Sequence, residues 1–458
     1  MTPRPRAEPP RWRRIDGVVA LCALLVVAVF SLRAWGFTGI SNDDASRTLI
    51  AWDFSRAPSL DPTRSSWLPV HTYTIGAILT VWRDPDAAPR ALSLVAAIAC
   101  VVLAARLARD LGAQRVATLA ALALAVSWRW TLLPAASGAV PEMPCAAWFL
   151  GAIVLLQRGR PALAGACLSL ACGHRYEAWF GGAALVAYEL VSRRPGAWRF
   201  ALTASVMPLA WLAINHARAG DALDFVHRVE AFRRAEGPLP PWLSRALREP
   251  LLLVTQLPLL VLAASRGLVG APAPDRDVTR TRRLAFAALA TLALVTLGDL
   301  RGGGATHHPA RALTLLAWTL TPLAALGFSS ITSRAWTLVA VALSLLLGAP
   351  RPRELHDGVS RDAVCAGDAV RRARATRSGP WFVEFARQDA LWVEARSGAP
   401  ERAFPDRAFG APSADPSRPV ARSGAQVAAA SSEATRASLR QSGYAITARC
   451  GAWSVWTR

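Results

Sequence analysis

The sequence predicts an all-α polytopic membrane protein that ends in a small α/β domain. Of its 458 residues, 53% are hydrophobic, and the mean hydropathy is +0.28. The apolar residues form continuous blocks of Leu, Ala and Val, many long enough to cross a hydrocarbon core of about 30 Å. These blocks stop near residue 350. We therefore expect a transmembrane domain over residues 1–350 and an extracytoplasmic α/β domain over residues 351–458.

The apolar blocks predict about eleven transmembrane helices. Several blocks are shorter than the usual ~20 residues, so their boundaries are loose. The predicted segments are 17–34, 88–108, 116–133, 141–157, 161–174, 176–192, 197–216, 248–266, 283–300, 310–328 and 334–349.

Charge sets the expected orientation of these helices. The formal net charge is +21, and every basic residue is an arginine. The arginines cluster in short connections that fall on one side of the membrane, which the positive-inside rule makes cytoplasmic. The N-terminus is then cytoplasmic, and the chain after residue 350 is outside. The first apolar run lacks a small-residue cleavage site, which favours an uncleaved helix. We expect no nucleic-acid partner.

The C-terminal domain has its own sequence signals. Residues 380–386 and 444–458 are typical of strands, residues 369–377 of a helix, and residues 412–422 of a loop. Cys365 and Cys450 flank this region and could form a disulfide if it is extracytoplasmic. The other cysteines lie in apolar segments, and no cysteine spacing indicates a metal site.

An acidic pair marks the first outer loop, residues 36–90. Asp43 and Asp44 begin the stretch DDASRTLIAWDFS, which predicts an amphipathic helix near the membrane interface. Ser41 or Asn42 supplies an N-cap, and carboxylates suit the positive end of a helix dipole. The pair is therefore open to a structural and to a chemical interpretation.

Further motifs follow the acidic pair in order. A Trp/Pro/His element spans residues 67–71, and D-P-x-x-x-P-R-x-L-S over residues 84–93 leads into the next helix. This order resembles the GT-C class of integral-membrane glycosyltransferases, in particular the dolichyl-phosphate-mannose protein mannosyltransferase and aminoarabinose-transferase-like group. Three later segments are also similar to elements of this group: 136–149, 173–180 and 211–225.

Two elements depart from the family pattern. The family often has His-Pro-Pro where this chain has Trp67-Leu68-Pro69-Val70-His71. The family's late Arg-Tyr element is replaced by His307-His308-Pro309-Ala310-Arg311. These departures bear on the subfamily more than on the superfamily.

The resemblance implies a reaction and its partners. The donor would be a sugar on a polyprenyl phosphate, with its tail among the membrane lipids of a bacterial inner membrane. The acceptor would be a lipid, a glycan or a protein at the outer face. By resemblance, Asp43 is the general base and Asp44 its partner, although the order of the two remains open. A positioned base contributes typically 10²–10⁴-fold.

Other polar and aromatic residues are candidates for binding substrate. The leaving phosphate needs positive charge or hydrogen-bond donors, and sugar rings stack on aromatic faces. Each candidate also has a structural interpretation, such as an interfacial arginine, an N-cap or an aromatic belt. The histidine pair is weak evidence for a divalent metal, so no metal ligand is assigned. The candidates are Trp67, His71, Glu142, Arg175, Tyr176, Glu177, Arg301, His307, His308 and Arg311.

Three other functions compete with sugar transfer. The main alternative is a transporter or flippase of lipid-linked saccharides, which would also have about a dozen helices. A polysaccharide polymerase or ligase would lack the early acidic pair. A non-catalytic membrane scaffold would leave Asp43 and Asp44 without a chemical role.

Overall fold

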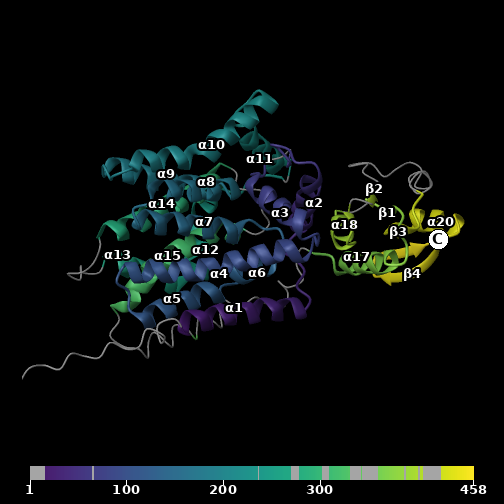
Figure 1. Ribbon diagram of the computed structural model, residues 1–458, viewed down its shortest axis with the longest axis horizontal. Helices are drawn as coiled ribbons and strands as arrows, with labels where there is room; N and C mark the ends of the chain where they lie inside the picture. Colours follow the sequence, from purple (N-terminus) through teal and green to yellow (C-terminus); the bar gives the residue numbers. More distant parts are fainter. Residues whose placement is uncertain are drawn as a thin grey trace, which may run out of the picture.

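The computed structural model describes residues 16–63, 66–235, 237–269, 278–301, 309–330, 342, 359–385, 388–400, 403–405 and 424–458. Most of these residues form a bundle of helices, and the C-terminal α/β unit (residues 359–458) lies at one end of it (Figure 1). The predicted span 334–349, apart from Ala342, and the predicted loop 412–422 lie outside the described residues.

Five helices of the described part are long and apolar enough to cross a membrane, or up to seven spans if two bent helix pairs each count as one. The count of eleven crossings stays a prediction, because one predicted span lies outside the described residues and three further apolar helices, α3, α7 and α8, are short. The helices of the bundle are α1 (Asp16–Ala34), α2 (Asn42–Arg56), α3 (Val70–Val81), α4 (Ala87–Asp110), α5 (Arg115–Ser127), α6 (Arg129–Ala136), α7 (Glu142–Gln157), α8 (Pro161–His174), α9 (Glu177–Val191), α10 (Ala197–Ala219), α11 (Asp224–Ala235), α12 (Trp242–Gln256), α13 (Pro258–Val269), α14 (Val278–Leu300), η2 (Pro309–Leu313) and α15 (Thr314–Ser329).

Two predicted spans are broken rather than continuous. The break between α5 and α6 bends the chain by 62°, and the break between α12 and α13 bends it by 97°. Trp128 is extended at the first break. Leu257 leaves the helical region at the second break because it precedes Pro258, and residues before proline disfavour helix. The indole of Trp128 donates to Gln256 Oε1 at 3.3 Å, so the two breaks meet.

Helix α15 lies at the centre of the bundle. In its apolar window 78% of the residues are buried, against 17% in the peripheral α1. Helix α13 packs closely on it through Gly267 and Gly327: a Cβ at Gly327 would lie only 1.8 Å from Ala263 O. Such close backbone approach through small residues is a common way for membrane helices to associate.

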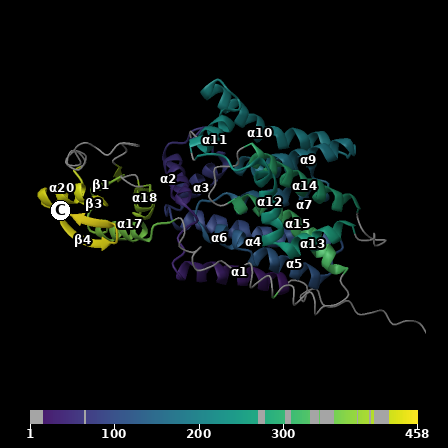
Figure 2. The same cartoon turned by 180° about the vertical axis from the view of Figure 1, so that it is seen from behind.

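The segment around the acidic pair folds as a helix, as the sequence predicts. Helix α2 begins at Asn42, and the Ser41 side chain accepts a hydrogen bond from Asp43 N at 3.3 Å. Helices α2 and α3 pack together at the end of the bundle that faces the C-terminal unit (Figure 2).

The C-terminal unit is built on a five-stranded sheet of order β2-β1-β3-β5-β4. β1 pairs in parallel with β2 and β3, while β5 is antiparallel to β3 and β4. These elements agree with the predicted strands, and the predicted helix overlaps the end of α17. The elements are α17 (Arg361–Arg374), β1 (Trp381–Val383), α18 (Ala390–Arg396), β2 (Ala403–Pro405), β3 (Val427–Ala430), α20 (Glu433–Gln441), β4 (Ala445–Cys450) and β5 (Trp453–Thr457).

Both faces of this sheet are covered. Trp381 and Val383 join the apolar cluster under α17 and α18, whereas Phe382 between them joins the cluster that includes Leu439 of α20. This is the alternation of a strand buried on both faces. Ala45 of α2 belongs to the first cluster, so the unit packs directly on the first outer loop. Cys365 and Cys450 form a disulfide, as the sequence allowed.

Candidate functional site

The two adjacent aspartates of α2 point in different directions. Successive residues of an α-helix are about 100° apart, so neighbours cannot share one target. The Asp43 side chain is 48% exposed, and its Oδ2 lies 3.9 Å from Arg311 Nη1. The Asp44 side chain is only 1% exposed and points into the protein.

Asp44 is held by hydrogen bonds within the fold. Its Oδ2 accepts from Ile40 N and from Ser137 Oγ, each at 2.7 Å. Burial raises the pKa of Asp44, while Arg311 and these two donors act in the opposite direction. Asp44 thus ties the chain that precedes α2 to the segment that follows α6.

The buried carboxylate of Glu142 binds two arginines close to Asp43. Glu142 is the first residue of α7 and is 1% exposed. Its Oε1 accepts from Arg175 Nη1 and from Arg311 Nε, and its Oε2 has no hydrogen-bond partner among the described residues. Arg311 therefore stands between Glu142 and Asp43.

Arg175 lies where α8 ends and α9 begins. Its Nε donates to Glu177 Oε2 at 3.0 Å, and its Nη2 donates to Glu177 Oε1. The fork of two parallel bonds fixes the plane of the guanidinium. Arg175 and Glu177, both candidates from the sequence, therefore face each other.

Arg47 also lies near Asp43 and these arginines, although it is not among the candidates from the sequence. It lies one turn after Asp43 on α2, and its guanidinium lies 4.1 Å from the centre of the Trp67 ring. Burial lowers the pKa of Arg47 to about 10. The carboxylates of Asp43 and Glu142 act to raise this pKa, and the guanidinium groups of Arg311 and Arg175 act to lower it. The signal was its spacing of four residues from Asp43, which puts both on one helix face.

His71 and His174 form an aromatic pair next to this cluster. Both are buried, and their rings meet edge to face at 5.4 Å. Within the described part of the chain, none of their ring nitrogens has a hydrogen-bond partner. Sequence reasoning selected His71 but not His174, which looks like an ordinary helix C-terminal residue.

Tyr176 connects the chain just before α3 to α10, and among the described residues its hydroxyl forms no hydrogen bond with Glu142 or Arg311. Its hydroxyl donates to Ser66 O at 2.8 Å and accepts from the Trp211 indole at 2.9 Å. Its ring stacks on Phe225 at 4.8 Å. Trp211 and Phe225 belong to the 211–225 segment that resembles the family, so the fold gives that segment a structural role.

Of the remaining predicted residues, the structure describes only Arg301, which lies away from this cluster. Arg301 is 77% exposed and lies 3.7 Å from Glu230. His307 and His308 lie outside the described residues. Among the residues that the structure describes, no group of three or more His, Cys, Asp and Glu could hold a metal ion.

The charged cluster, defined here as Asp43, Arg47, Glu142, Arg175, Glu177 and Arg311, has three carboxylates and three guanidinium groups. Two of the carboxylates, Glu142 and Glu177, are engaged by arginines at hydrogen-bond distance. Among the described residues, the ion pair of Asp43 is the long contact to Arg311, and Asp43 is the most accessible of the three carboxylates. Such an arrangement can take a proton at Asp43 and bind an anion next to it.

Comparison with solved structures identifies the fold. No protein-family model and no curated protein matches the sequence. ArnT from Cupriavidus metallidurans, solved bound to undecaprenyl phosphate, aligns with a TM-score of 0.61 at 15% identity, over 96% of this chain and 98% of that chain. The chain has the ArnT fold.

Two further structures are similar to this chain. ArnT in the apo state aligns with a TM-score of 0.58 at 15% identity, over 96% of this chain and 97% of that chain. The arabinosyltransferase EmbB from Mycobacterium smegmatis aligns with a TM-score of 0.46 at 17% identity, over 88% of this chain and 38% of that chain. ArnT is an aminoarabinose transferase, so the resemblance expected from the sequence is confirmed at the level of the fold.

Proposed function

We propose that this chain is a GT-C glycosyltransferase of a bacterial inner membrane. It would move a sugar from a polyprenyl-phosphate carrier to a lipid, glycan or protein acceptor at the outer face. The ArnT fold supports this proposal, because ArnT was solved bound to undecaprenyl phosphate. The accessible Asp43 beside buried arginines supports it independently.

The proposed topology follows the sequence. Residues 1–350 would be the transmembrane catalytic domain, with the N-terminus in the cytoplasm, and residues 351–458 would be an extracytoplasmic α/β domain. The disulfide between Cys365 and Cys450 supports an oxidising location for this domain. The charged cluster would then lie at the outer surface, where the lipid tail stays in the bilayer and the sugar phosphate meets water.

In the proposed reaction, Asp43 is the general base. It removes the proton of the acceptor nucleophile as that atom bonds to the anomeric carbon of the sugar. The bond from the anomeric carbon to the phosphate oxygen breaks, and the polyprenyl phosphate leaves with the electron pair. Asp43 suits this role because it is half exposed, whereas Asp44 already accepts two hydrogen bonds inside the protein.

The arginines of the cluster would bind the phosphate. Negative charge grows on the phosphate as the bond breaks, and fixed cations near it lower the barrier. Arg311 and Arg175 are oriented by Glu142, so they are positioned before the donor arrives. Arg47, which stacks on the Trp67 ring, adds a third guanidinium group. Its Nε has no hydrogen-bond partner among the described residues.

The observation that carries this proposal is the approach of Asp43 to Arg311. Its test is sugar transfer from a panel of polyprenyl-phosphate sugars in membranes, comparing wild type with Asp43→Asn. Glu433→Gln is a matched control. Like Asp43, Glu433 lies in the first turn of a helix with a serine N-cap, and it is 74% exposed on α20 of the C-terminal unit.

We expect transfer by the wild type and by Glu433→Gln, and little transfer by Asp43→Asn at matched expression. Equal transfer by all three proteins would show that Asp43 is not the general base. Movement of intact lipid-linked saccharide across the membrane without transfer would instead support the transporter alternative.

A further inference from the structure

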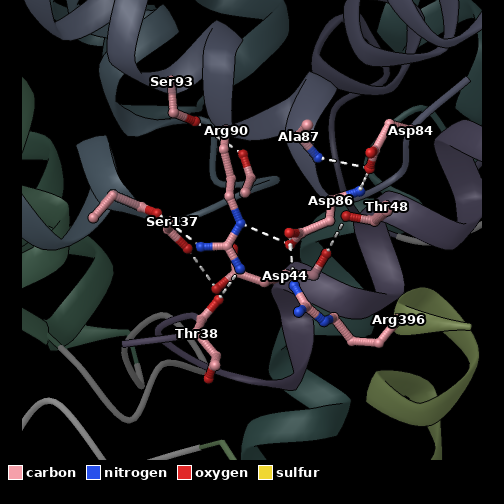
Figure 3. A network of polar contacts seen from close by, with 12 residues as sticks. Thr38, Asp44, Thr48, Asp84, Asp86, Ala87, Arg90, Ser93, Ser137 and Arg396 are labelled. Carbon is pink, nitrogen blue, oxygen red and sulfur yellow. Dashed lines mark hydrogen bonds and ion pairs between the residues drawn. The ribbon is translucent and has the colours of Figure 1, made fainter. Parts of the chain in front are cut away.

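A polar network connects the C-terminal unit to the backbone that carries Asp43 (Figure 3). Its labelled members lie before and within α2, around the start of α4, just after α6, and in α18 of the C-terminal unit. Arg396, the last residue of α18, is the only member from the C-terminal unit that Figure 3 labels.

Arg396 bridges two carboxylates. Its Nη1 lies 2.6 Å from Asp86 Oδ2 at the start of α4. Its Nε and Nη2 donate to Asp368 of α17 at 3.1 and 3.2 Å. Asp368 therefore holds the guanidinium from within the C-terminal unit while it reaches across to the bundle. Hydrogen bonds between charged partners of this kind are among the stronger ones in proteins.

The second carboxylate oxygen of Asp86 binds Arg90. Asp86 Oδ1 accepts from Arg90 Nε at 2.8 Å, and Arg90 is 5% exposed. Arg90 in turn donates from Nη2 to Thr38 O at 2.7 Å and from Nη1 to Ala136 O at 3.1 Å. One guanidinium thus joins the end of α6 to the stretch that precedes α2.

The two carbonyls that Arg90 holds flank the Asp44 site. Ala136 is followed by Ser137, which donates to Asp44, and Thr38 lies two residues before Ile40, whose amide also donates to Asp44. The C-terminal unit touches this stretch a second time through Trp392. A Cβ at Gly39 would lie 2.6 Å from the Trp392 ring and 2.8 Å from Asp44 Oδ2, so only glycine fits between them.

We propose that Arg396 is a positioning residue for Asp43, acting through Asp86 and Arg90. The inference rests on the proposed function. The direction of the Asp43 side chain is set by the orientation of the first turn of α2. That turn is fixed by Ser41, Asp44 and the backbone between Thr38 and Ile40. Arg396 steadies this backbone from outside the bundle, so the C-terminal unit contributes to the geometry of the reaction.

The same interface supplies a matched control. Arg371 of α17 lies 3.8 Å from Asp84 of the bundle, and its side chain is 55% exposed. Arg396 is 19% exposed and lies 2.6 Å from its partner. Both arginines connect the C-terminal unit to the bundle. The contact of Arg396 continues through the Asp86 side chain to Arg90 and Thr38, whereas Asp84 accepts from the backbone amides of Asp86 and Ala87.

The experiment compares Arg396→Ala with Arg371→Ala in the full-length protein. Amide hydrogen exchange in the peptide covering residues 36–44 reports the order of the backbone directly. We expect exchange there to become about tenfold faster in Arg396→Ala and to stay unchanged in Arg371→Ala. We also expect kcat for sugar transfer to fall by about ten- to a hundredfold in Arg396→Ala, with the donor KM within about threefold of wild type.

Arg396→Lys separates charge from shape. Lysine keeps the positive charge facing Asp86 but cannot bridge Asp86 and Asp368 with a planar fork. We expect it to restore part of the exchange protection and part of kcat, which mere loss of packing at this interface would not predict.

Two results would overturn the inference. One is unchanged exchange over residues 36–44 in Arg396→Ala. The other is the same acceleration in Arg371→Ala, which would indicate general loosening of the interface. Absence of sugar transfer by the wild type would count against the proposed function alone, because the exchange comparison still decides whether Arg396 orders this backbone.

Discussion

The guanidinium of Arg311 lies 3.9 Å from the carboxylate of Asp43 while its Nε donates to the buried Glu142. One arginine therefore contacts an accessible carboxylate and an inaccessible one. Because Glu142 fixes Arg311, Asp43 meets a cation that is already in place. The same buried carboxylate also holds Arg175, so α2, α7, η2 and the connection between α8 and α9 converge at this point.

Glu142→Gln should destabilise the protein. The change removes the negative charge that offsets the repulsion between the guanidinium groups of Arg175 and Arg311. The side chains of these arginines are only 21% and 6% exposed. Breaking a buried ion pair by removing one partner typically costs about 3–5 kcal/mol. Thermal unfolding in detergent measures this loss, and Glu433→Gln on the exposed α20 is the control. A melting temperature equal to that of the wild type would contradict the anchoring role of Glu142.

Arg47→Gln should weaken binding of the donor. We place its guanidinium, stacked on Trp67, next to the leaving phosphate, and a hydrogen bond to a charged group contributes about 1.5–3 kcal/mol. The donor KM should rise by roughly tenfold or more. Arg47→Lys should lose less, since it keeps the charge but not the planar stack. Equal KM values for wild type and Arg47→Gln would place the phosphate elsewhere.

Glu189→Ala should unfold the bundle at lower temperature without a specific effect on transfer. Arg283 of α14 donates to Glu189 of α9 through Nε at 2.5 Å and Nη2 at 2.9 Å, and both residues are buried. The uncompensated arginine should cost about 3–5 kcal/mol, whereas replacing both residues with leucine should recover most of it. If the double variant is no more stable than Glu189→Ala, the loss of stability in Glu189→Ala does not come from an unpaired Arg283.

The lowered pKa of Asp86 should make the free energy of unfolding depend on pH in the acid range. Burial alone would raise its pKa, but Arg90 and Arg396 outweigh burial and hold the pKa at about 2, below its ordinary value of 3.8. A lowered carboxyl pKa stabilises the fold at pH values above the ordinary pKa. This contribution, roughly 2 kcal/mol, is lost as the pH falls from about 4 to about 2.

Melting temperatures of wild type and Asp86→Asn across this pH range test that prediction. Wild type should be more stable at pH 5 and above, and the difference should vanish near pH 2. A difference that stays constant through this window would show that the charge of Asp86 is not the cause.

The sequence predicts local features of this protein better than distant pairings. The helix after Ser41 follows from its cap and acidic first turn, and the strands of the C-terminal unit follow from their length and apolar content. Glu142 meets Arg311 across 169 residues and Arg175 across 33, and neither spacing nor periodicity encodes such contacts. Only the order of the family-like motifs suggested that these segments share a site.

Two misses have specific physical reasons. Arg47 was overlooked because an arginine in an amphipathic helix is usually solvated, whereas here it is buried and stacks on Trp67. The bends in the predicted spans 116–133 and 248–266 were overlooked because hydropathy does not register helix breaks. Pro258 was a local signal for the second break, since the residue before proline tends to leave the helix.

The most direct test of this account is single-turnover sugar transfer by Asp43→Asn, with binding of the polyprenyl-phosphate sugar measured on the same preparation. Asparagine keeps the size of the side chain but cannot take a proton. We expect a loss of about 10²–10⁴-fold in the rate of transfer, with donor affinity within about threefold of wild type. A transfer rate close to that of the wild type, with the donor bound normally, would contradict the assignment of Asp43 as the general base.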